Sequence, residues 1–216
     1  MSAVAPPEAK AVTPDFLEAV GATAERLQDI ETFRRLLAEA NRQVNLVGDS
    51  TLGDFWRRHF VDSAQLLWFR PAAGRWADLG SGAGLPGLVL AILLKDRPGA
   101  QIHLIESMAK RCRFLTEVVE ILALPAVVHN ARAESLKLEV EMVTARACAP
   151  LDKLLAYAEP YVARGAQALF LKGADVEAEI ANARRVWRFK AETQVSLSDP
   201  RGRLLSIREL ERVGRP

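Results

Sequence analysis

The segment DLGSGAGLPG at residues 78–87 restricts what this chain can fold into more than any other feature. An apolar, strand-like run leads into Gly80, Gly82 and Gly84, and a helical pattern begins near Leu85. Glycines in such a loop adopt positive φ and let a ligand approach the bare backbone. The free N–H groups of the following helix attract an anion. A glycine loop placed between a strand and a helix therefore favours a binding site over a turn that serves packing alone.

Short apolar runs alternate with helical patterns from residue 75 onward. The strand-like runs before the last helical pattern are RWADLG (75–80), QIHLIE (101–106), AVVHN (126–130), EMVTAR (141–146) and ALFLKG (168–173). Helical patterns begin near Leu85, Ser107, Leu151 and Asp175. This alternation predicts βαβ units and a mostly parallel sheet with helices on both faces. The runs at 187–197 and 203–210 have no helical pattern between them and predict an antiparallel hairpin.

Residues 1–70 read as a helical extension that precedes the sheet. An Ala- and Pro-rich start, which we expect to be a frayed tail, is followed by Thr13-Pro14, a typical helix start. Apolar residues at three- and four-residue steps predict an amphipathic helix from Thr23 to about Gln43. A further helix is predicted over 51–69, opened by a capping-box pattern. The predicted organisation is thus a tail and helical extension at 1–70 and a second domain at 71–216.

Composition excludes several other classes of protein. Half of the residues are hydrophobic and 26% are charged, which excludes wholesale disorder. The longest apolar run, at 88–94, is far shorter than the roughly 20 residues of a membrane-spanning helix. No basic start is followed by an apolar stretch, and the two cysteines, Cys112 and Cys148, suggest neither a disulfide framework nor a metal site. We therefore expect a cytoplasmic protein that has no membrane partner.

The spacing of the glycines bears on which ligand the loop binds. The dinucleotide fingerprint G-x-G-x-x-G would require glycine at position 85, where this chain has Leu85. The match is to G-x-G-x-G with an acidic residue, Asp78, just before it, a form typical of S-adenosylmethionine enzymes. Glu106 ends the next strand and can accept hydrogen bonds from both ribose hydroxyls. Both a nicotinamide dinucleotide and S-adenosylmethionine contain adenosine. Glu106 is therefore compatible with either cofactor and does not distinguish between the two classes of protein.

Seven sequence blocks resemble one known family, the RsmG/GidB family of bacterial small-subunit ribosomal RNA guanine-N7 methyltransferases. The blocks are NLVGDS (45–50), RRHFVDS (57–63), DLGSGAGLPGLVLAI (78–92), ESMAKRCRFL (106–115), ARAES (131–135), ARACAPL (145–151) and LKG (171–173). The resemblance implies a class I methyltransferase fold: an α/β, Rossmann-like, mostly parallel seven-stranded sheet with an N-terminal helical extension and an antiparallel C-terminal hairpin. It also implies S-adenosylmethionine as donor and 16S rRNA, free or in a small-subunit assembly intermediate, as acceptor.

The cofactor contacts come from two sources. Asp78, Gly82, Gly84 and Glu106 follow from the loop and the strand end described above. The resemblance, carried over residue by residue, places further contacts at Gly80, Leu85, Ala133, Glu134 and Arg146.

The sequence names no catalytic acid or base. The Asn/Asp-Pro-Pro-aromatic motif typical of amine methylation is missing, and Cys148, the sole candidate nucleophile for pyrimidine C5, is expected to be a small buried residue. Guanine N7 carries no proton, so catalysis by orientation suffices. The alternatives are another RNA or a small-molecule acceptor, a nicotinamide-dependent oxidoreductase, and a cofactor-binding protein without catalysis.

Basic residues near the motifs are candidates for RNA contacts. They are Arg58, His59, Lys110, Arg111 and Lys172, each of which could instead serve a structural or solvated position. Charge also differs along the chain: residues 1–56 carry five Lys and Arg against nine Asp and Glu, and residues 184–216 carry nine against four. This asymmetry is typical of a chain whose basic end faces an anionic partner, although surface scatter could also produce it.

Overall fold

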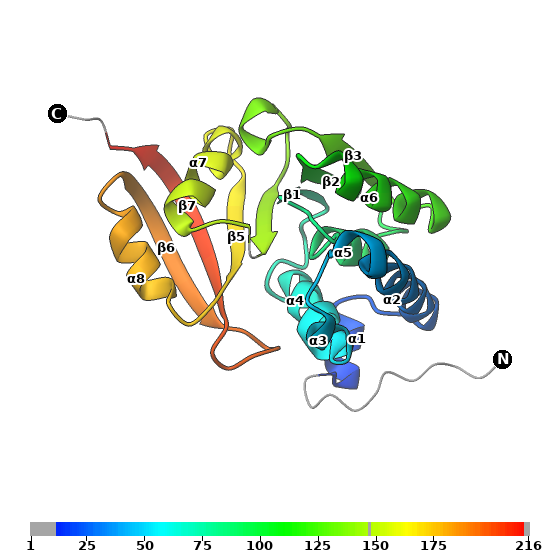
Figure 1. Cartoon of the computed structure of the whole chain (residues 1–216). Helices are drawn as coiled ribbons and strands as arrows, with labels where there is room; N and C mark the ends of the chain where they lie inside the picture. Colours follow the sequence, from blue (N-terminus) through cyan, green and yellow to red (C-terminus); the bar gives the residue numbers. More distant parts are fainter. Residues whose placement is uncertain (1–11, 147, 214–216) are drawn as a thin grey trace.

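The computed structural model describes residues 12–146 and 148–213, and its centre is one seven-stranded sheet (Figure 1). The strand order is β3-β2-β1-β4-β5-β7-β6. The strands are β1 (Arg75–Leu79), β2 (Gln101–Glu106), β3 (Ala126–Asn130), β4 (Met142–Arg146), β5 (Gln167–Lys172), β6 (Trp187–Val195) and β7 (Arg203–Arg212). The predicted α/β fold is confirmed, and the sequence placed β2 and β3 at their observed bounds.

The sheet is parallel from β3 to β5 and antiparallel beyond. β7 pairs antiparallel with both β5 and β6, so the predicted C-terminal hairpin is confirmed. In this register Lys172, at the end of β5, lies opposite Arg203, at the start of β7. The turn between β6 and β7 therefore lies at the same edge of the sheet as the carboxyl ends of the parallel strands.

Helices cover both faces of the sheet. They are α1 (Pro14–Ala19), α2 (Ala24–Val44), α3 (Asp49–Leu52), the π-helix η1 (Trp56–Val61), α4 (Asp62–Phe69), α5 (Gly87–Leu93), α6 (Ala109–Ile121), the 3₁₀ helix η2 (Ala133–Ser135), α7 (Leu151–Val162) and α8 (Val176–Ala183). Successive residues of β1 enter opposite cores: Trp76 packs in one buried cluster and Ala77 in the other. Such burial on both faces is typical of parallel strands.

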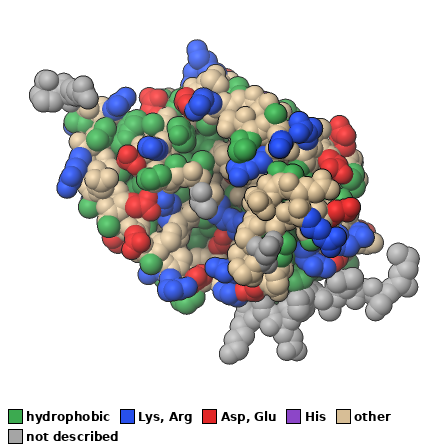
Figure 2. Space-filling view, viewed as in Figure 1, with side chains coloured by type: hydrophobic (Ala, Val, Ile, Leu, Met, Phe, Trp, Pro, Cys, Tyr) green, Lys and Arg blue, Asp and Glu red, His purple; other side chains and the backbone are tan. Residues whose placement is uncertain are grey.

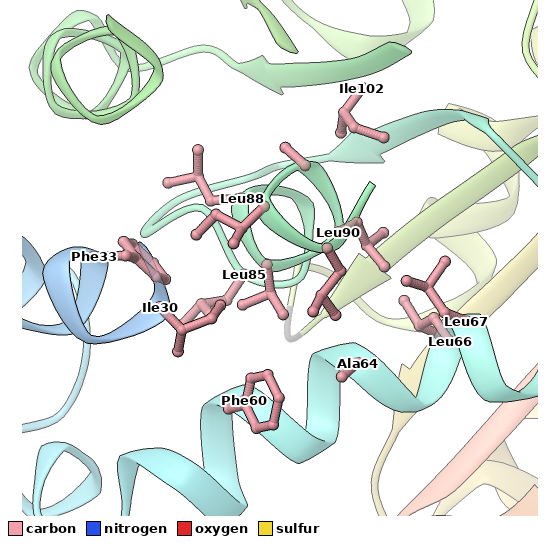
Figure 3. Close-up of a cluster of buried hydrophobic side chains, with 14 of the residues drawn as sticks. Ile30, Phe33, Phe60, Ala64, Leu66, Leu67, Leu85, Leu88, Leu90 and Ile102 are labelled. Carbon is pink, nitrogen blue, oxygen red and sulfur yellow. The ribbon is translucent and has the colours of Figure 1, made fainter. Parts of the chain in front are cut away.

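The N-terminal helices share a core with the sheet. Ile30 and Phe33 of α2 and Phe60 of η1 belong to the same buried cluster as Leu85 and Leu88 (Figure 3). Each of the three side chains from the extension is fully buried. The domain boundary at residue 70 stays a prediction, but the two parts depend on one hydrophobic cluster.

The helix starts at Thr13 and Thr23 are confirmed. The Thr13 hydroxyl accepts a hydrogen bond from the Phe16 amide at 3.2 Å, and the Thr23 hydroxyl accepts one from the Arg26 amide at 3.3 Å. Each satisfies one of the amides that a helix start leaves unpaired. The tail expected at the start of the chain lies, up to residue 11, outside the described residues.

The continuous helix predicted over 51–69 is wrong. Thr51 lies inside the short helix α3, and its hydroxyl donates to the Gly48 carbonyl at 2.7 Å instead of capping a helix. Asp54 pairs with Arg57. After a turn, the chain resumes as a π-helix, a rare form found often at functional sites, and continues into α4. No helix in the described part of the chain has both the length and the apolar character needed to cross a membrane.

Candidate functional site

A cavity of about 1000 Å³ opens at the carboxyl ends of β1, β2, β4 and β5. Blue Lys and Arg side chains flank a hollow on the face shown in Figure 2. The cavity brings together most of the residues that the sequence singled out: Arg58, His59, Gly80, Gly82, Leu85, Glu106, Arg111, Ala133, Glu134, Arg146 and Lys172. Ligands of open α/β sheets bind at this edge.

The glycine loop follows β1 and presents bare backbone to the cavity. The amides of Gly80 and Ser81 donate to the Ile105 carbonyl at 2.8 and 3.0 Å, which ties the loop to β2. Gly80 and Gly82 have φ of 68° and 55°. A side chain on Gly80 would collide with the sulfur of Cys148, whereas a Cβ on Gly82 would have one neighbour within 4 Å, the Gly80 carbonyl oxygen at 3.7 Å. The loop therefore leaves an open, unobstructed surface at Gly82.

The Glu106 carboxylate lies across from this loop. It is 4% exposed, and its oxygens accept hydrogen bonds from the Gly82 amide at 3.1 Å and the Met108 amide at 2.8 Å. The Arg111 guanidinium is 3.6 Å from one of these oxygens. An acceptor carboxylate at the end of the second strand is the group that binds ribose hydroxyls in related folds.

The structure separates Asp78 and Gly84 from the cavity lining. Asp78 is fully buried; one oxygen accepts from the Gly87 amide at 3.1 Å, and the other has no hydrogen-bond partner among the described residues. Burial raises the pKa of Asp78 to about 7. A Cβ on Gly84 would collide with Leu88. Both residues shape the loop from beneath instead of facing a ligand.

The remaining cofactor candidates form further parts of the wall. Ala133 and Glu134 begin η2, where the Tyr161 hydroxyl donates to the Ala133 carbonyl at 2.8 Å. Burial, followed by the charge of Glu134, raises the pKa of Tyr161 to about 12, so this phenol remains a donor. Leu85, only 4% exposed, closes the end of the glycine loop.

Arg146 joins the sheet to the N-terminal helices. One guanidinium nitrogen donates to the Arg58 carbonyl at 2.8 Å and contacts the Asp62 carboxylate at 3.2 Å. The other nitrogen is 3.1 Å from Nδ1 of His59. Since a guanidinium can only donate, Nδ1 of His59 is the acceptor of this bond.

His59 is a neutral, structural imidazole. Its Nε2 is 3.0 Å from the Thr51 hydroxyl, which in turn donates to the Gly48 carbonyl. Burial, followed by the charges of Arg146 and Arg58, lowers the pKa of His59 to about 4. This residue therefore orders the segment before η1, and its single ring proton, on Nε2, is donated to the Thr51 hydroxyl.

The basic candidates differ in how free they are. Arg58 is exposed at the cavity, and no carboxylate lies within ion-pair distance among the described side chains. Lys172 is 2.7 Å from the Glu179 carboxylate. Lys110 does not line the cavity; it lies in a smaller groove between α2 and α6. The structure thus brings together four of the five predicted RNA contacts.

Cys148 corrects a further expectation. It is exposed and lines the cavity, rather than being buried at the end of a strand. Desolvation raises the pKa of its thiol, and the charges of Asp78 and Glu106 act in the same direction. A thiol that stays protonated is a poor nucleophile.

Sequence reasoning missed the wall formed by the β6–β7 turn. This turn lines the cavity with Ser196, Ser198, Asp199, Arg201, Gly202 and Arg203. Two polar side chains of the N-terminal helices, Asp62 and Gln65, hydrogen-bond to it. The excess of basic residues over 184–216 indicated that this end of the chain is basic but did not place it at the cavity.

Sequence comparison finds relatives that span nearly the whole chain. A family model, GidB, described as rRNA small subunit methyltransferase G, matches residues 26–205. A protein of Caulobacter vibrioides named Ribosomal RNA small subunit methyltransferase G is 56% identical over 207 residues, which are 96% of each chain. A protein of the same name from Parvibaculum lavamentivorans is 43% identical over 199 residues, which are 90% of this chain and 88% of that relative.

Solved structures share the fold at low identity. The magnesium protoporphyrin IX methyltransferase of Synechocystis PCC 6803, solved with bound S-adenosylmethionine, superposes with a TM-score of 0.52 and 15% identity. The match covers 92% of this chain and 99% of that one. This likeness confirms the Rossmann-like methyltransferase sheet that the sequence predicts.

Proposed function

The chain belongs to the GidB family of rRNA small subunit methyltransferase G proteins, as its sequence blocks predict, and from this premise we propose that it transfers a methyl group from S-adenosylmethionine to N7 of one guanine in 16S rRNA. The observation that carries the proposal is the cavity in which a bare glycine loop faces the Glu106 carboxylate. We propose free 16S rRNA or a small-subunit assembly intermediate as the acceptor and the cytoplasm as the site of the reaction.

The residues around the cavity fit the donor. Gly82 leaves open the space that a Cβ would fill, so a ligand can lie against the loop. Each Glu106 oxygen accepts one backbone amide and keeps a lone pair for a ribose hydroxyl. We assign the other cofactor contacts to Gly80, Leu85, Ala133, Glu134 and Arg146, which line the same space.

The chemistry of guanine N7 agrees with the absence of an obvious base in the described cavity. When bound, S-adenosylmethionine supplies a methyl group whose bond to a positively charged sulfur breaks as the new bond to N7 forms. The N7 lone pair lies in the ring plane and carries no proton, so no side chain has to remove one. His59 is neutral and bonded on both nitrogens, and the Cys148 thiol is protonated. The residues of this chain therefore act by binding, orienting and desolvating the reactants.

The charge of the cavity favours a polyanionic acceptor. Its lining has eight Lys and Arg against four Asp and Glu, whereas the whole chain has a net charge of +2. The rest of the chain is therefore slightly negative, and the cations are concentrated around the site. We propose that Arg58 and Arg111 contact RNA phosphates there. Lys172 and His59, which are bonded to other residues of the chain, support the cavity wall instead.

Methyl transfer with mass mapping tests the proposal. Purified protein is incubated with labelled S-adenosylmethionine and either naked 16S rRNA or small subunits from a strain lacking the gene, and the RNA is digested and mapped. The expected product is one N7-methylated guanine. Methylation of an exocyclic amine or of another RNA would overturn the acceptor. Calorimetric binding of NAD without binding of S-adenosylmethionine would overturn the donor.

A further inference from the structure

Two walls of the cavity, the β6–β7 turn and the end of β4, meet at one carboxylate of the N-terminal helices, that of Asp62. One oxygen of Asp62 accepts a hydrogen bond from the Ser198 hydroxyl at 2.6 Å. The other oxygen is 3.2 Å from the guanidinium of Arg146. Ser198 belongs to the β6–β7 turn, and Arg146 ends β4 in the wall of the cavity.

We propose that Asp62 is a positioning residue that fixes the RNA-facing turn and the cofactor-facing Arg146 as one unit. The proposal rests on the proposed function, which assigns Arg146 to the cofactor, and it adds that the basic β6–β7 turn, which lines the same cavity, faces the RNA. Asp62 itself has 18% of its side chain exposed, as does Arg146, so the pair is well shielded from screening by water.

Gln65, one turn of helix after Asp62, extends these contacts into a buried polar network. We call this network of Asp62, Gln65, Ser196 and Ser198 the latch. Its side chain is fully buried, and its oxygen accepts a hydrogen bond from the Leu197 amide at 2.8 Å. Its nitrogen donates to the Ser196 hydroxyl at 3.0 Å and to the Asp62 carbonyl at 2.9 Å. Every polar atom of the amide side chain is thus engaged, a condition under which a buried network specifies one arrangement.

Two more contacts close the latch from both sides. The Arg57 guanidinium donates to the Ser198 carbonyl at 2.8 Å, and the Ser196 and Ser198 hydroxyls are 2.9 Å apart. Ser196 and Ser198 are 7% and 6% exposed, so solvent does not replace these bonds when they are lost. The turn is therefore held as a fixed wall rather than as a free loop.

The carboxylate divides its two roles between its two oxygens, so variants can separate them. Asp62→Asn keeps an acceptor for Ser198 but removes the charge that faces Arg146. Ser198→Ala removes the bond to the turn and leaves the charge in place. Ser63→Ala is the matched control, because Ser63 is also fully buried but has no hydrogen-bond partner among the described residues.

The binding experiment measures two affinities for each variant of the full chain. Calorimetry gives the Kd for S-adenosylmethionine, and filter binding gives the Kd for 16S rRNA. Asp62→Asn is expected to raise the Kd for S-adenosylmethionine about tenfold, the effect of losing one charge-assisted hydrogen bond. Ser198→Ala is expected to weaken RNA binding about fivefold and to change the Kd for S-adenosylmethionine less than twofold. Ser63→Ala changes neither, and Ser198→Thr restores RNA binding.

A second readout does not depend on the reaction. The Leu197 amide, bonded to Gln65, should exchange with deuterium at least tenfold faster in Ser198→Ala than in Ser63→Ala. The proposal is overturned if Ser198→Ala matches Ser63→Ala in both RNA binding and exchange, or if Asp62→Asn binds S-adenosylmethionine as the wild type does. Should the wild type methylate no guanine N7, the proposed function fails, and the exchange rates still decide the latch.

Discussion

At the scale of single residues, the two glycines of the loop after β1 that line the cavity, Gly80 and Gly82, are constrained in different ways. Gly80 is enclosed, because a side chain there would meet Cys148, whereas Gly82 is open to the cavity. Both have positive φ, so strain and steric obstruction of a ligand would act together in any substitution. A test has to separate these two effects.

Gly82→Val is expected to abolish binding of S-adenosylmethionine, since a branched side chain would occupy the open space in the loop. Gly165→Val is the control: Gly165 has φ of 98°, open surroundings and no place in the cavity lining. Both variants should lose roughly 1–3 kcal/mol of stability through backbone strain, measured by urea unfolding. Equal S-adenosylmethionine affinities in calorimetry would contradict the assigned site.

The buried groups Asp78 and His59 should give stability opposite dependences on pH. The pKa of Asp78 is raised from 3.8 to about 7, so between these values the folded state holds the extra proton, and stability falls as pH rises. The pKa of His59 is lowered from 6.5 to about 4, so there the unfolded state holds the extra proton, and stability rises with pH. The free energy of unfolding of Asp78→Asn should therefore rise relative to that of the wild type as pH increases from about 4.5 to 7. Urea unfolding across this range checks it; a pH-independent difference between the two proteins would refute it.

The rate of methyl transfer should vary little with pH. His59 stays neutral above about pH 5 because its pKa is about 4, and guanine N7 loses no proton on attack. Single-turnover rates at saturating donor and RNA are expected to be flat between about pH 6.5 and 8.5. His59→Gln should lower them by a constant factor. A rate that rises tenfold per pH unit and loses this rise in His59→Gln would mean that a base operates.

At the scale of elements, the sequence located what depends on local pattern. Alternating apolar runs predicted all seven strands, and β2 and β3 match their observed bounds because both are flanked by clear turn signals. The π-helix η1 was missed. His59 in this helix and Asp62 just after it contact Arg146, more than 80 residues later in the chain, and no local pattern encodes such contacts. The capping-box pattern at Thr51 misled for a different, local reason: that hydroxyl is bonded to Gly48 and His59 and is not available to cap a helix.

The start of helix α2 at Thr23, which the sequence predicted correctly, can be tested directly. Thr23→Ala removes the hydroxyl that accepts the Arg26 amide and should lower the free energy of unfolding by about 1 kcal/mol. Thr32→Ala, within the same helix, removes an exposed bond to the Gln28 carbonyl and should be neutral or slightly stabilising. Urea unfolding of the two variants distinguishes the cases, and equal losses would show that the cap contributes nothing.

At the scale of the whole molecule, two parts of the cavity, the glycine loop with Glu106 and the wall formed by the β6–β7 turn, differ in how far the sequence could predict them. The glycine loop and Glu106 lie on consecutive units of one βαβ pattern, so their meeting follows from topology. The turn wall requires Gln65 to meet Ser196, and nothing in the local pattern of either segment encodes that pairing. Charge along the chain indicated only that the C-terminal end was basic.

The distribution of charge predicts strong salt dependence of RNA binding. Doubling salt from about 0.1 M should weaken binding several-fold, because each phosphate contact to a single strand adds roughly 0.7 to the log–log slope. Replacing both Arg58 and Arg201 with Gln should lower the slope by about 1, since each is exposed in the cavity lining. Arg35 and Arg185, exposed but outside that lining, provide the paired control. A flat salt profile would indicate a small-molecule acceptor.

The bond between Gln65 and Ser196 joins positions 131 residues apart, and this separation orders events during synthesis. A chain emerging from a ribosome exposes the glycine loop and Glu106 long before the residues of the turn have been translated. Contacts between such distant segments form late, because the intervening chain must first be ordered. A nascent chain therefore lacks the wall formed by the β6–β7 turn until residues 196–203 have been made and have packed against helix α4.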